Sequence, residues 1–191
     1  MSDTWTQVQE AVGWLRARSG FAPRVGLILG TGLGDLAGQI EPVLTVPFAQ
    51  IPHFVPSTAE SHAGNLILGA LGGQPVVAMQ GRVHYYEGYS MKQITLPVRV
   101  MRALGATTLI MSNAVGGMNP QLRPGHLTVV TDHINLMGDN PLVGPNDERL
   151  GVRFPDMSEP YARDYLELIE AVALEQRIPL RRAVYVAVAG P

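Results

Sequence analysis

The chain contains no cysteine among its 191 residues. This absence excludes disulfide bonds, thiolate metal sites and cysteine nucleophiles, and it fits a reducing compartment. No apolar run reaches the roughly 18 residues that a membrane-spanning helix needs, and the N-terminal residues lack the basic and apolar regions of a signal peptide. We therefore expect a soluble protein of the cytoplasm.

The sequence also has little charge of either sign, because charged residues make up only 16% of it. Fourteen Lys and Arg stand against sixteen Asp and Glu, which gives a formal net charge of -2. Proteins that bind nucleic acids normally carry a basic surface, so we expect no nucleic-acid partner and no membrane partner. With 46% hydrophobic residues, the length suits one α/β domain with a substantial core, or part of a larger one.

Several motifs of common enzyme classes are missing. No histidine pair has the i, i+4 spacing of a helical zinc site and no acidic cluster resembles a calcium loop, so we expect no metal. The absence of Gly-x-Ser-x-Gly removes support for a serine hydrolase. The glycine-rich residues 30–34 do not match the dinucleotide fingerprint, because Asp35 follows them, and no Gly-Lys-Ser/Thr of a P-loop occurs.

Apolar strands that alternate with amphipathic helices predict an α/β fold with a mixed central β-sheet flanked by helices. Helical spacing of apolar residues predicts helices over residues 4–19, 91–104 and 161–176. Apolar runs predict strands over residues 25–29, 65–71, 74–80, 107–111, 127–131 and 183–189. Gly72-Gly73 predicts a hairpin, which makes the sheet mixed. The last helix is expected to turn these residues inward: Tyr161, Tyr165, Leu168, Ile169 and Val172.

Polar, glycine-containing loops follow several of the predicted strands directly. They comprise residues 30–34, 81–84 and 112–117. Because ligands of open α/β sheets bind beyond the carboxyl ends of strands, we expect these loops to converge on one site. The first loop can direct amide N–H groups and the Thr31 hydroxyl toward an anion, but a tight turn without a ligand explains it equally well. A long polar stretch at residues 139–160 is typical of a functional loop.

The loop after the hairpin carries the most informative side chains. If residues 82–86 are extended, Arg82, His84 and Tyr86 project from one face. Arginine offers a rigid fork for phosphate, histidine a second donor, and tyrosine a ring suited to a sugar. A solvated edge strand with an incidental basic pair is the alternative, but the pattern favours an anion site. His62, taken alone, is more often a structural histidine than a catalytic one.

Longer segments, taken in chain order, form a more specific pattern. They are Gly30-Thr31-Gly32-Leu33-Gly34, Ser61-His62-Ala63-Gly64, residues 80–89, Asn113-Ala114-Val115-Gly116-Gly117, residues 144–149, residues 153–158 and residues 185–191. Over essentially the whole chain this pattern resembles the trimeric purine nucleoside phosphorylases. The Gln-Gly-Arg-x-His-x-Tyr-Glu-Gly-Tyr run at residues 80–89 favours this subgroup over the related methylthioadenosine phosphorylases.

The resemblance implies an enzyme of purine salvage, a pentosyltransferase that forms a homotrimer. Its reaction is reversible phosphorolysis, in which a purine ribonucleoside or deoxyribonucleoside and phosphate give the free base and the pentose 1-phosphate. Inorganic phosphate is the co-substrate and no cofactor is implied. Because phosphate is the nucleophile, the protein needs to position the dianion against a cationic sugar carbon, without paired carboxylates or an activated serine.

The resemblance also assigns residues. The phosphate-binding residues would be Thr31, His62, Arg82, Val83, His84 and the backbone at Ala114. Of these, the catalytic residues would be Arg82, His84 and His62. The sugar would be contacted by Tyr86, Tyr185 and Phe154, the last reaching into the pocket of a neighbouring subunit.

The family pattern continues past the Ala-Gly-Pro of residues 189–191 with residues that recognise the purine. We therefore expect residues 1–191 to form a single nucleoside phosphorylase domain without its C-terminal part, and this piece alone to be inactive. Base preference and the choice between ribose and deoxyribose stay open. So do two other functions: a phosphorylase for another nucleoside, and a non-catalytic anion-binding or interaction domain.

Overall fold

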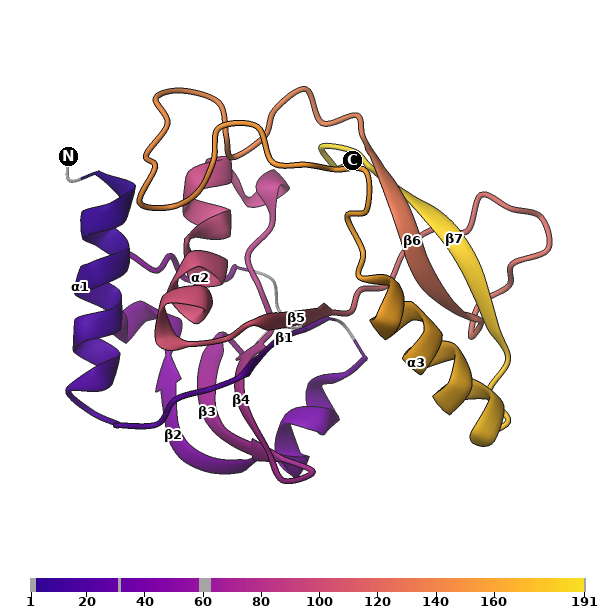
Figure 1. Cartoon of the computed structure of the whole chain (residues 1–191), viewed down its shortest axis with the longest axis horizontal. Coiled ribbons are helices and arrows are strands. Elements are labelled where there is room, and N and C mark those ends of the chain that lie inside the picture. Colours follow the sequence, from indigo (N-terminus) through magenta and orange to yellow (C-terminus); the bar gives the residue numbers. More distant parts are fainter. Residues whose placement is uncertain (1–2, 31, 59–62, 191) are drawn as a thin grey trace. The chain divides into compact units, whose positions relative to one another are not determined.

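A computed structural model describes residues 3–30, 32–58 and 63–190 (Figure 1). The chain divides into two compact units, Met1–Ala114 and Val115–Pro191. That residues 1–191 form a single domain stays a prediction. None of the helices in the described part of the chain is long and apolar enough to cross a membrane.

The first unit is built on a mixed sheet, as predicted. Its described residues form five strands in the order β2-β3-β4-β1-β5. They are β1 (Val25–Leu29), β2 (Glu41–Pro47), β3 (Asn65–Leu71), β4 (Gln74–Gln80) and β5 (Thr108–Met111). β1 runs parallel to both β4 and β5, whereas β2, β3 and β4 pair antiparallel. Gly72 and Gly73 form the predicted hairpin with φ of 55° and 75°, a region that residues with a Cβ rarely adopt.

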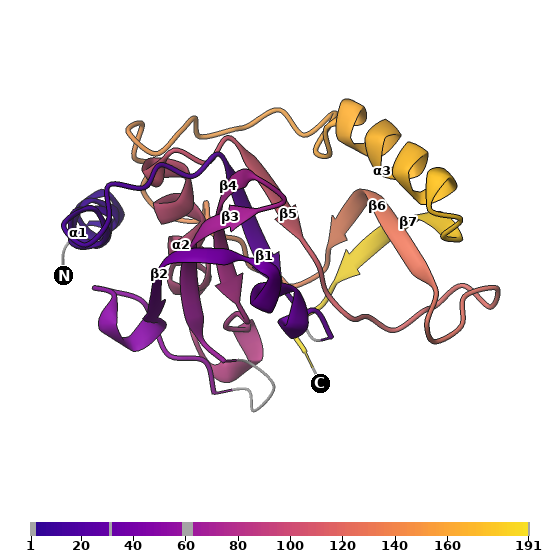
Figure 2. The same cartoon turned by 90° about the horizontal axis from the view of Figure 1, so that it is seen from below.

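Two helices complete the core of the first unit. The helices α1 (Thr4–Arg16) and α2 (Met91–Leu104) pack against each other (Figures 1 and 2). The hydroxyl of Ser90 caps α2, and the helix has the predicted bounds with Pro97 inside it. Beneath the sheet, apolar side chains of β1, β3 and β4 form a buried cluster with the short 3₁₀ helix η1 (Gly34–Gln39). This core holds the strand ends that carry the candidate site.

The strand β2 is an addition to the predicted elements. Its sequence begins with Glu41-Pro42 and ends at Pro47, and proline argues against a central strand because it lacks a ladder N–H. The structure resolves the conflict by placing β2 at the edge of the sheet, with a register irregularity between Pro42 and Leu44. Edge strands and bulges tolerate proline, so the prolines of this segment did not exclude a strand.

Over its described residues, 115–190, the second unit contains a parallel pair of strands and one helix. The strands β6 (Leu127–Asn135) and β7 (Leu180–Ala187) pair in parallel, and α3 (Arg163–Glu175) lies alongside them (Figure 2). β6 extends beyond its predicted end. Between β6 and α3, residues 139–160 hold no helix or strand, and all of them are described. The predicted long loop is therefore confirmed.

The predicted inward face of α3 is wrong within this unit. Four of its side chains are 42–55% exposed, namely Tyr165, Leu168, Ile169 and Val172. Ala173 is the buried residue of this helix, which the structure describes throughout. A two-stranded ribbon offers too little surface to cover a helix face, so the amphipathic pattern is present without a matching partner.

Candidate active site

Three strand ends meet at one edge of the first unit's sheet. β4, β1 and β5 are neighbours and run parallel, so their carboxyl ends share that edge. The amide of Gly30, which follows β1, donates to the Ser112 hydroxyl at 3.1 Å. The Arg82 Nη1, from the loop after β4, donates to the Ser112 carbonyl oxygen at 2.8 Å. The predicted convergence of these loops is therefore confirmed.

The close approach of two of these loops depends on Gly30. A Cβ at this position would lie 2.3 Å from the Ser112 carbonyl oxygen and 2.9 Å from the Asn113 Cα. Both atoms belong to the backbone, so no side-chain rotation relieves the overlap. Glycine at residue 30 is thus a condition for the loops after β1 and β5 to lie side by side.

Replacing Gly30 by alanine is expected to force the two loops apart and to destabilise the fold by about 1–3 kcal/mol, as overpacking does. Urea denaturation measures the change. Gly34→Ala is the matched control, because a Cβ there meets nothing within 4 Å. Equal stability of the two variants would show that the loops after β1 and β5 accommodate a Cβ at residue 30, which would contradict the predicted overlap.

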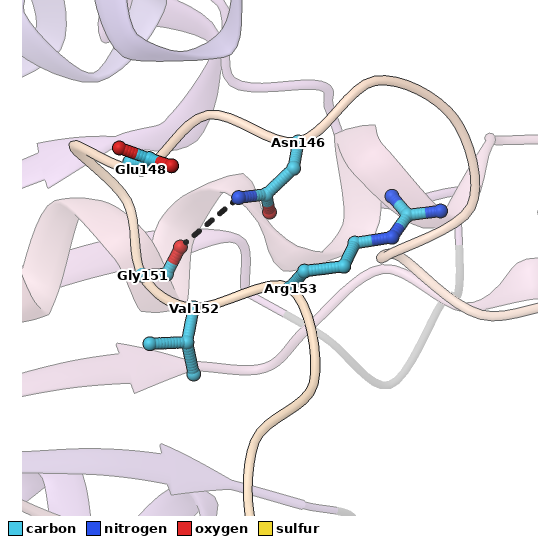
Figure 3. Close-up of a pocket in the computed structure, with 5 residues that line it drawn as sticks. All are labelled: Asn146, Glu148, Gly151, Val152 and Arg153. Carbon is cyan, nitrogen blue, oxygen red and sulfur yellow. Dashed lines mark hydrogen bonds between the residues drawn. The ribbon is translucent and has the colours of Figure 1, made fainter.

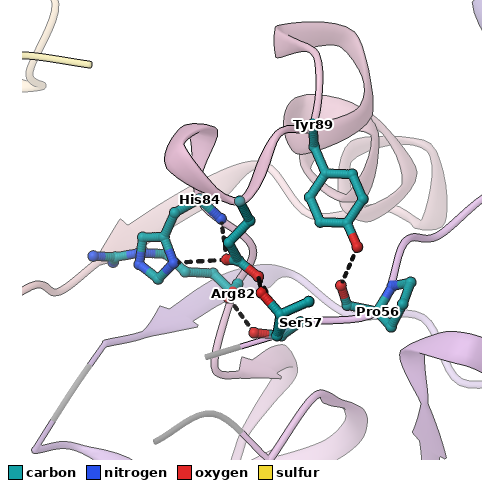
Figure 4. A network of polar contacts seen from close by, with 7 residues as sticks. Pro56, Ser57, Arg82, His84 and Tyr89 are labelled. Atoms are coloured by element: carbon teal, nitrogen blue, oxygen red, sulfur yellow. Dashed lines mark hydrogen bonds and ion pairs between the residues drawn. The ribbon is translucent and has the colours of Figure 1, made fainter. Parts of the chain in front are cut away.

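A chain of hydrogen bonds links the predicted anion-binding side chains (Figure 4). The Arg82 Nε donates to the His84 Nε2 at 3.3 Å, and the His84 Nδ1 lies 3.0 Å from the Glu87 Oε1. Because Nε2 accepts a hydrogen bond, the proton of the neutral ring is assigned to Nδ1. The two predicted residues are therefore adjacent, and Glu87 determines the orientation of the His84 ring.

The backbone that carries these residues is not the extended one considered for them in the sequence. β4 ends at Gln80, Gly81 has a φ of 93°, and His84 caps the 3₁₀ helix η3 (Tyr85–Glu87). Residues 82–86 are therefore not an extended strand, and strand alternation does not explain their placement. The ring of Tyr86 nevertheless stacks on that of His84, with centroids 4.9 Å apart and planes inclined by 15°.

Glu87 is a site residue that sequence reasoning missed. Its side chain is only 2% exposed. One carboxylate oxygen accepts from the amide and ring of His84, and the other accepts from the amide and hydroxyl of Thr58, both at 2.6 Å. The capping-box spacing from His84 to Glu87 was the available signal, but it ordinarily begins with Ser or Thr.

These contacts decide the charge of Glu87. Burial by itself raises the pKa of its carboxyl, but the hydrogen bonds from Thr58 and His84 outweigh burial and lower the pKa from 4.5 to about 2. Glu87 is therefore a carboxylate at every physiological pH.

The segment that ends at Thr58 is tied to the same cluster. The Ser57 hydroxyl donates to the Arg82 carbonyl oxygen at 3.0 Å, and the Tyr89 hydroxyl donates to that of Pro56 at 2.9 Å (Figure 4). Together with the bonds from Thr58 to Glu87, they anchor residues 56–58 at the site.

The remaining predicted phosphate residues differ in what the structure shows of them. Thr31 and His62 lie outside the described residues. Val83 is 4% exposed and contributes its side chain to the core, which leaves only its backbone for an anion. Ala114 is exposed at the end of the first unit. The roles of all four stay predictions.

The second unit holds the other two predicted sugar-binding residues. Tyr185 is half-buried on β7, in register with His133 on β6. Phe154 lies in the long loop and is 87% exposed. A hollow of about 370 Å³ in the same loop is lined by Asn146, Glu148, Gly151, Val152 and Arg153 (Figure 3). Among the described residues that line it, none belongs to the predicted site.

Comparison with known proteins agrees with this geometry. Residues 24–191 match the phosphorylase superfamily. Purine nucleoside phosphorylase 1 of Geobacillus stearothermophilus is 52% identical over 186 residues, which cover 97% of this chain and 68% of that protein. Purine nucleoside phosphorylase of Rattus norvegicus is 42% identical over 193 residues, which cover 98% of this chain and 67% of that protein. A crystal structure of a purine nucleoside phosphorylase in complex with ribose-1-phosphate is 42% identical, with a TM-score of 0.93 over 100% of this chain and 73% of that one.

The chain therefore belongs to the phosphorylase superfamily. Within it, its function is that of a purine nucleoside phosphorylase, a pentosyltransferase. The predicted family, fold class and function are confirmed.

Proposed function

We propose that Arg82 and His84 bind the inorganic phosphate that this enzyme uses to cleave the N-glycosidic bond of purine nucleosides. The observation that supports the proposal most directly is the bonded chain from Arg82 through His84 to Glu87 at the carboxyl edge of β4, β1 and β5. It places a guanidinium and an imidazole side by side, where the strand ends of an α/β sheet bind ligands.

Each member of this chain has a distinct task. The bonds to Ser112 and His84 orient the Arg82 guanidinium, whose planar fork suits a phosphate oxygen pair. When the His84 Nε2 is protonated, it donates to phosphate in place of accepting from the Arg82 Nε, and the ring keeps its bond to the anionic Glu87. The cluster therefore directs a guanidinium and an imidazole at the proposed dianion, and its hydrogen bonds hold both groups in place before phosphate arrives.

The reaction follows from this placement. A phosphate oxygen forms a bond to the anomeric carbon of the sugar while the bond from that carbon to the purine nitrogen breaks. The electron pair of the broken bond leaves with the base, which takes up a proton. The positive charge that develops on the sugar is stabilised by the dianion beside it, so positioning supplies most of the catalysis.

Aromatic side chains are proposed to complete the sugar site. Tyr86 stacks on His84 and is 57% exposed, so its ring flanks the proposed phosphate position. Tyr185 and Phe154 are the further proposed sugar contacts. Phe154 is 87% exposed, as expected of a side chain that completes the pocket of a neighbouring copy in a homotrimer. We propose that the enzyme acts in the cytoplasm and that its chemistry needs no cofactor besides phosphate.

Phosphate-dependent release of hypoxanthine from inosine tests this function, on the protein as its gene encodes it. Calorimetric titration with phosphate is run beside it. Cleavage that requires phosphate supports the proposal. Phosphate binding without inosine cleavage but with cleavage of another nucleoside would favour a different substrate, and binding without any cleavage would favour an anion-binding domain.

Replacing Phe154 by alanine is expected to raise the nucleoside KM about tenfold, because a lost aromatic contact costs on the order of 1 kcal/mol or more. The phosphate KM and the oligomeric state should not change, since the side chain lies outside the proposed phosphate cluster. Steady-state kinetics and sedimentation measure these quantities. A fully active monomer in sedimentation would remove the basis for a contribution across subunits.

A further inference from the structure

The loop that carries Phe154 is closed by its neighbour in sequence, Arg153. The Arg153 Nη1 donates to the carbonyl oxygens of Leu142 at 3.0 Å and Gly144 at 2.5 Å. These acceptors lie 11 and 9 residues earlier in the chain. The guanidinium carbon also lies 5.9 Å from the centre of the Phe154 ring. One side chain therefore joins the start of the loop to the aromatic near its end.

A second contact makes the same loop more compact. The Asn146 amide donates to the Gly151 carbonyl oxygen at 3.5 Å, inside the segment that Arg153 closes (Figure 3). Gly144 accepts from Arg153 and Gly151 accepts from Asn146. Their φ values of 105° and 141° lie in a region that glycine adopts readily, which allows tight turns at both residues. The segment is thus folded by its own hydrogen bonds, without a helix or strand.

Such closure has a direct consequence for an exposed aromatic residue. An open loop would sample many conformations, and each binding event would have to order it again. In the closed loop, the position of Phe154 is determined before any partner surface arrives. The cost of ordering is then paid during folding and not during nucleoside binding.

We propose that Arg153 is a positioning residue, which preorganises residues 142–154 so that Phe154 is presented to the sugar site of a second copy of this chain. This proposal rests on the proposed function of Phe154. Arginine suits the task better than lysine, because one planar group bonds two carbonyl oxygens and also lies against an aromatic ring.

The neighbouring Arg149 supplies a matched control. It forms an ion pair with Asp147, two residues away, with a distance of 2.6 Å from Nη2 to Oδ2. That contact is local and does not join distant parts of the loop. Arg149 and Arg153 thus share residue type and loop, and the closing contacts to Leu142 and Gly144 are those of Arg153.

The experiment compares Arg153→Met, Arg153→Lys and Arg149→Met with and without Phe154→Ala. Arg153→Met is expected to raise the nucleoside KM about five- to tenfold, with kcat and the phosphate KM unchanged, because ordering of the loop now accompanies binding. Arg153→Lys should have a smaller effect and Arg149→Met none. In the Phe154→Ala background, Arg153→Met should add nothing, since no ring remains to be positioned.

Limited proteolysis of residues 142–154 gives a readout that does not depend on activity. Cleavage should be faster in Arg153→Met than in the wild type or Arg149→Met, and if Arg153→Met does not fold, Arg153→Lys carries the same comparison. Additive effects of Arg153→Met and Phe154→Ala on the KM would overturn the proposal, as would an unchanged KM in Arg153→Met. If Phe154→Ala alone leaves the KM unchanged, the proposed function of Phe154 fails instead.

Discussion

Replacing Arg82 by alanine is expected to weaken phosphate binding by about ten- to a hundredfold, while the nucleoside KM at saturating phosphate changes far less. A lost bidentate, charge-assisted contact costs about 1.5–3 kcal/mol, which corresponds to that loss of affinity. The guanidinium also bonds the Ser112 carbonyl oxygen and the His84 ring, so the substitution removes these two hydrogen bonds as well. Calorimetric titration with inorganic phosphate measures the effect.

Arg102→Ala is the matched control for this variant. Arg102 also donates to a backbone carbonyl oxygen, that of Ala106 at 3.2 Å, but it lies in the last turn of α2 and outside the cluster. Its loss should leave phosphate affinity unchanged. An Arg82→Ala protein that binds phosphate as tightly as the wild type would exclude Arg82 from the phosphate site.

Replacing Glu87 by glutamine is expected to abolish a stabilisation of about 3 kcal/mol that depends on pH. The folded protein lowers the pKa of Glu87 from 4.5 to about 2, and each unit of such a shift is worth about 1.4 kcal/mol. Because the pKa is lower in the folded state, this stability is fully present above pH 4.5 and is lost as the pH falls toward 2. The glutamine variant lacks this contribution at every pH.

Urea denaturation of both proteins between pH 7 and pH 3 measures the difference in the free energy of unfolding. The gap between them should be largest at neutral pH and should narrow below pH 4.5. Glu159→Gln is the control, because Glu159 is 57% exposed and pairs with Arg163 at 3.6 Å on the surface. Such surface pairs contribute little, so the difference in the free energy of unfolding between Glu159→Gln and the wild type should be small at all pH values. A gap for Glu87→Gln that does not vary with pH would contradict the low pKa of the buried carboxylate.

Local patterns in the sequence predicted most elements of the first unit. Residues 25–29 and 91–104 form the expected strand and helix, and the Gly72-Gly73 hairpin has the expected ends. These signals depend on side-chain spacing and glycine chemistry within a few residues, which tertiary contacts did not override. β2 was missed because its prolines are tolerated only at a sheet edge, and the sequence does not show which strands lie at edges.

For the candidate site, too, the sequence predicted some residues, and others depend on tertiary contacts that it does not show. Arg82 and His84 were found from residue type and from their place after a strand, and the structure brings them together. The extended conformation considered for residues 82–86 does not occur, because Gly81 and the His84 cap direct the chain into η3. Glu87 was missed because its burial and charge depend on Thr58, 29 residues earlier in the chain.

By itself, the sequence determined the helices and all strands but β2 of the first unit, the anion-binding residue types and the family, because these depend on local spacing and on motifs. Only the tertiary structure decided that β4, β1 and β5 are neighbours, since the pairing of distant strands is set by hydrogen-bond register and burial. That order brings Gly30, Arg82 and Ser112 into contact. The tertiary structure also decided that Glu87 is an ionised, buried carboxylate, because donors from Thr58 and from His84 surround it.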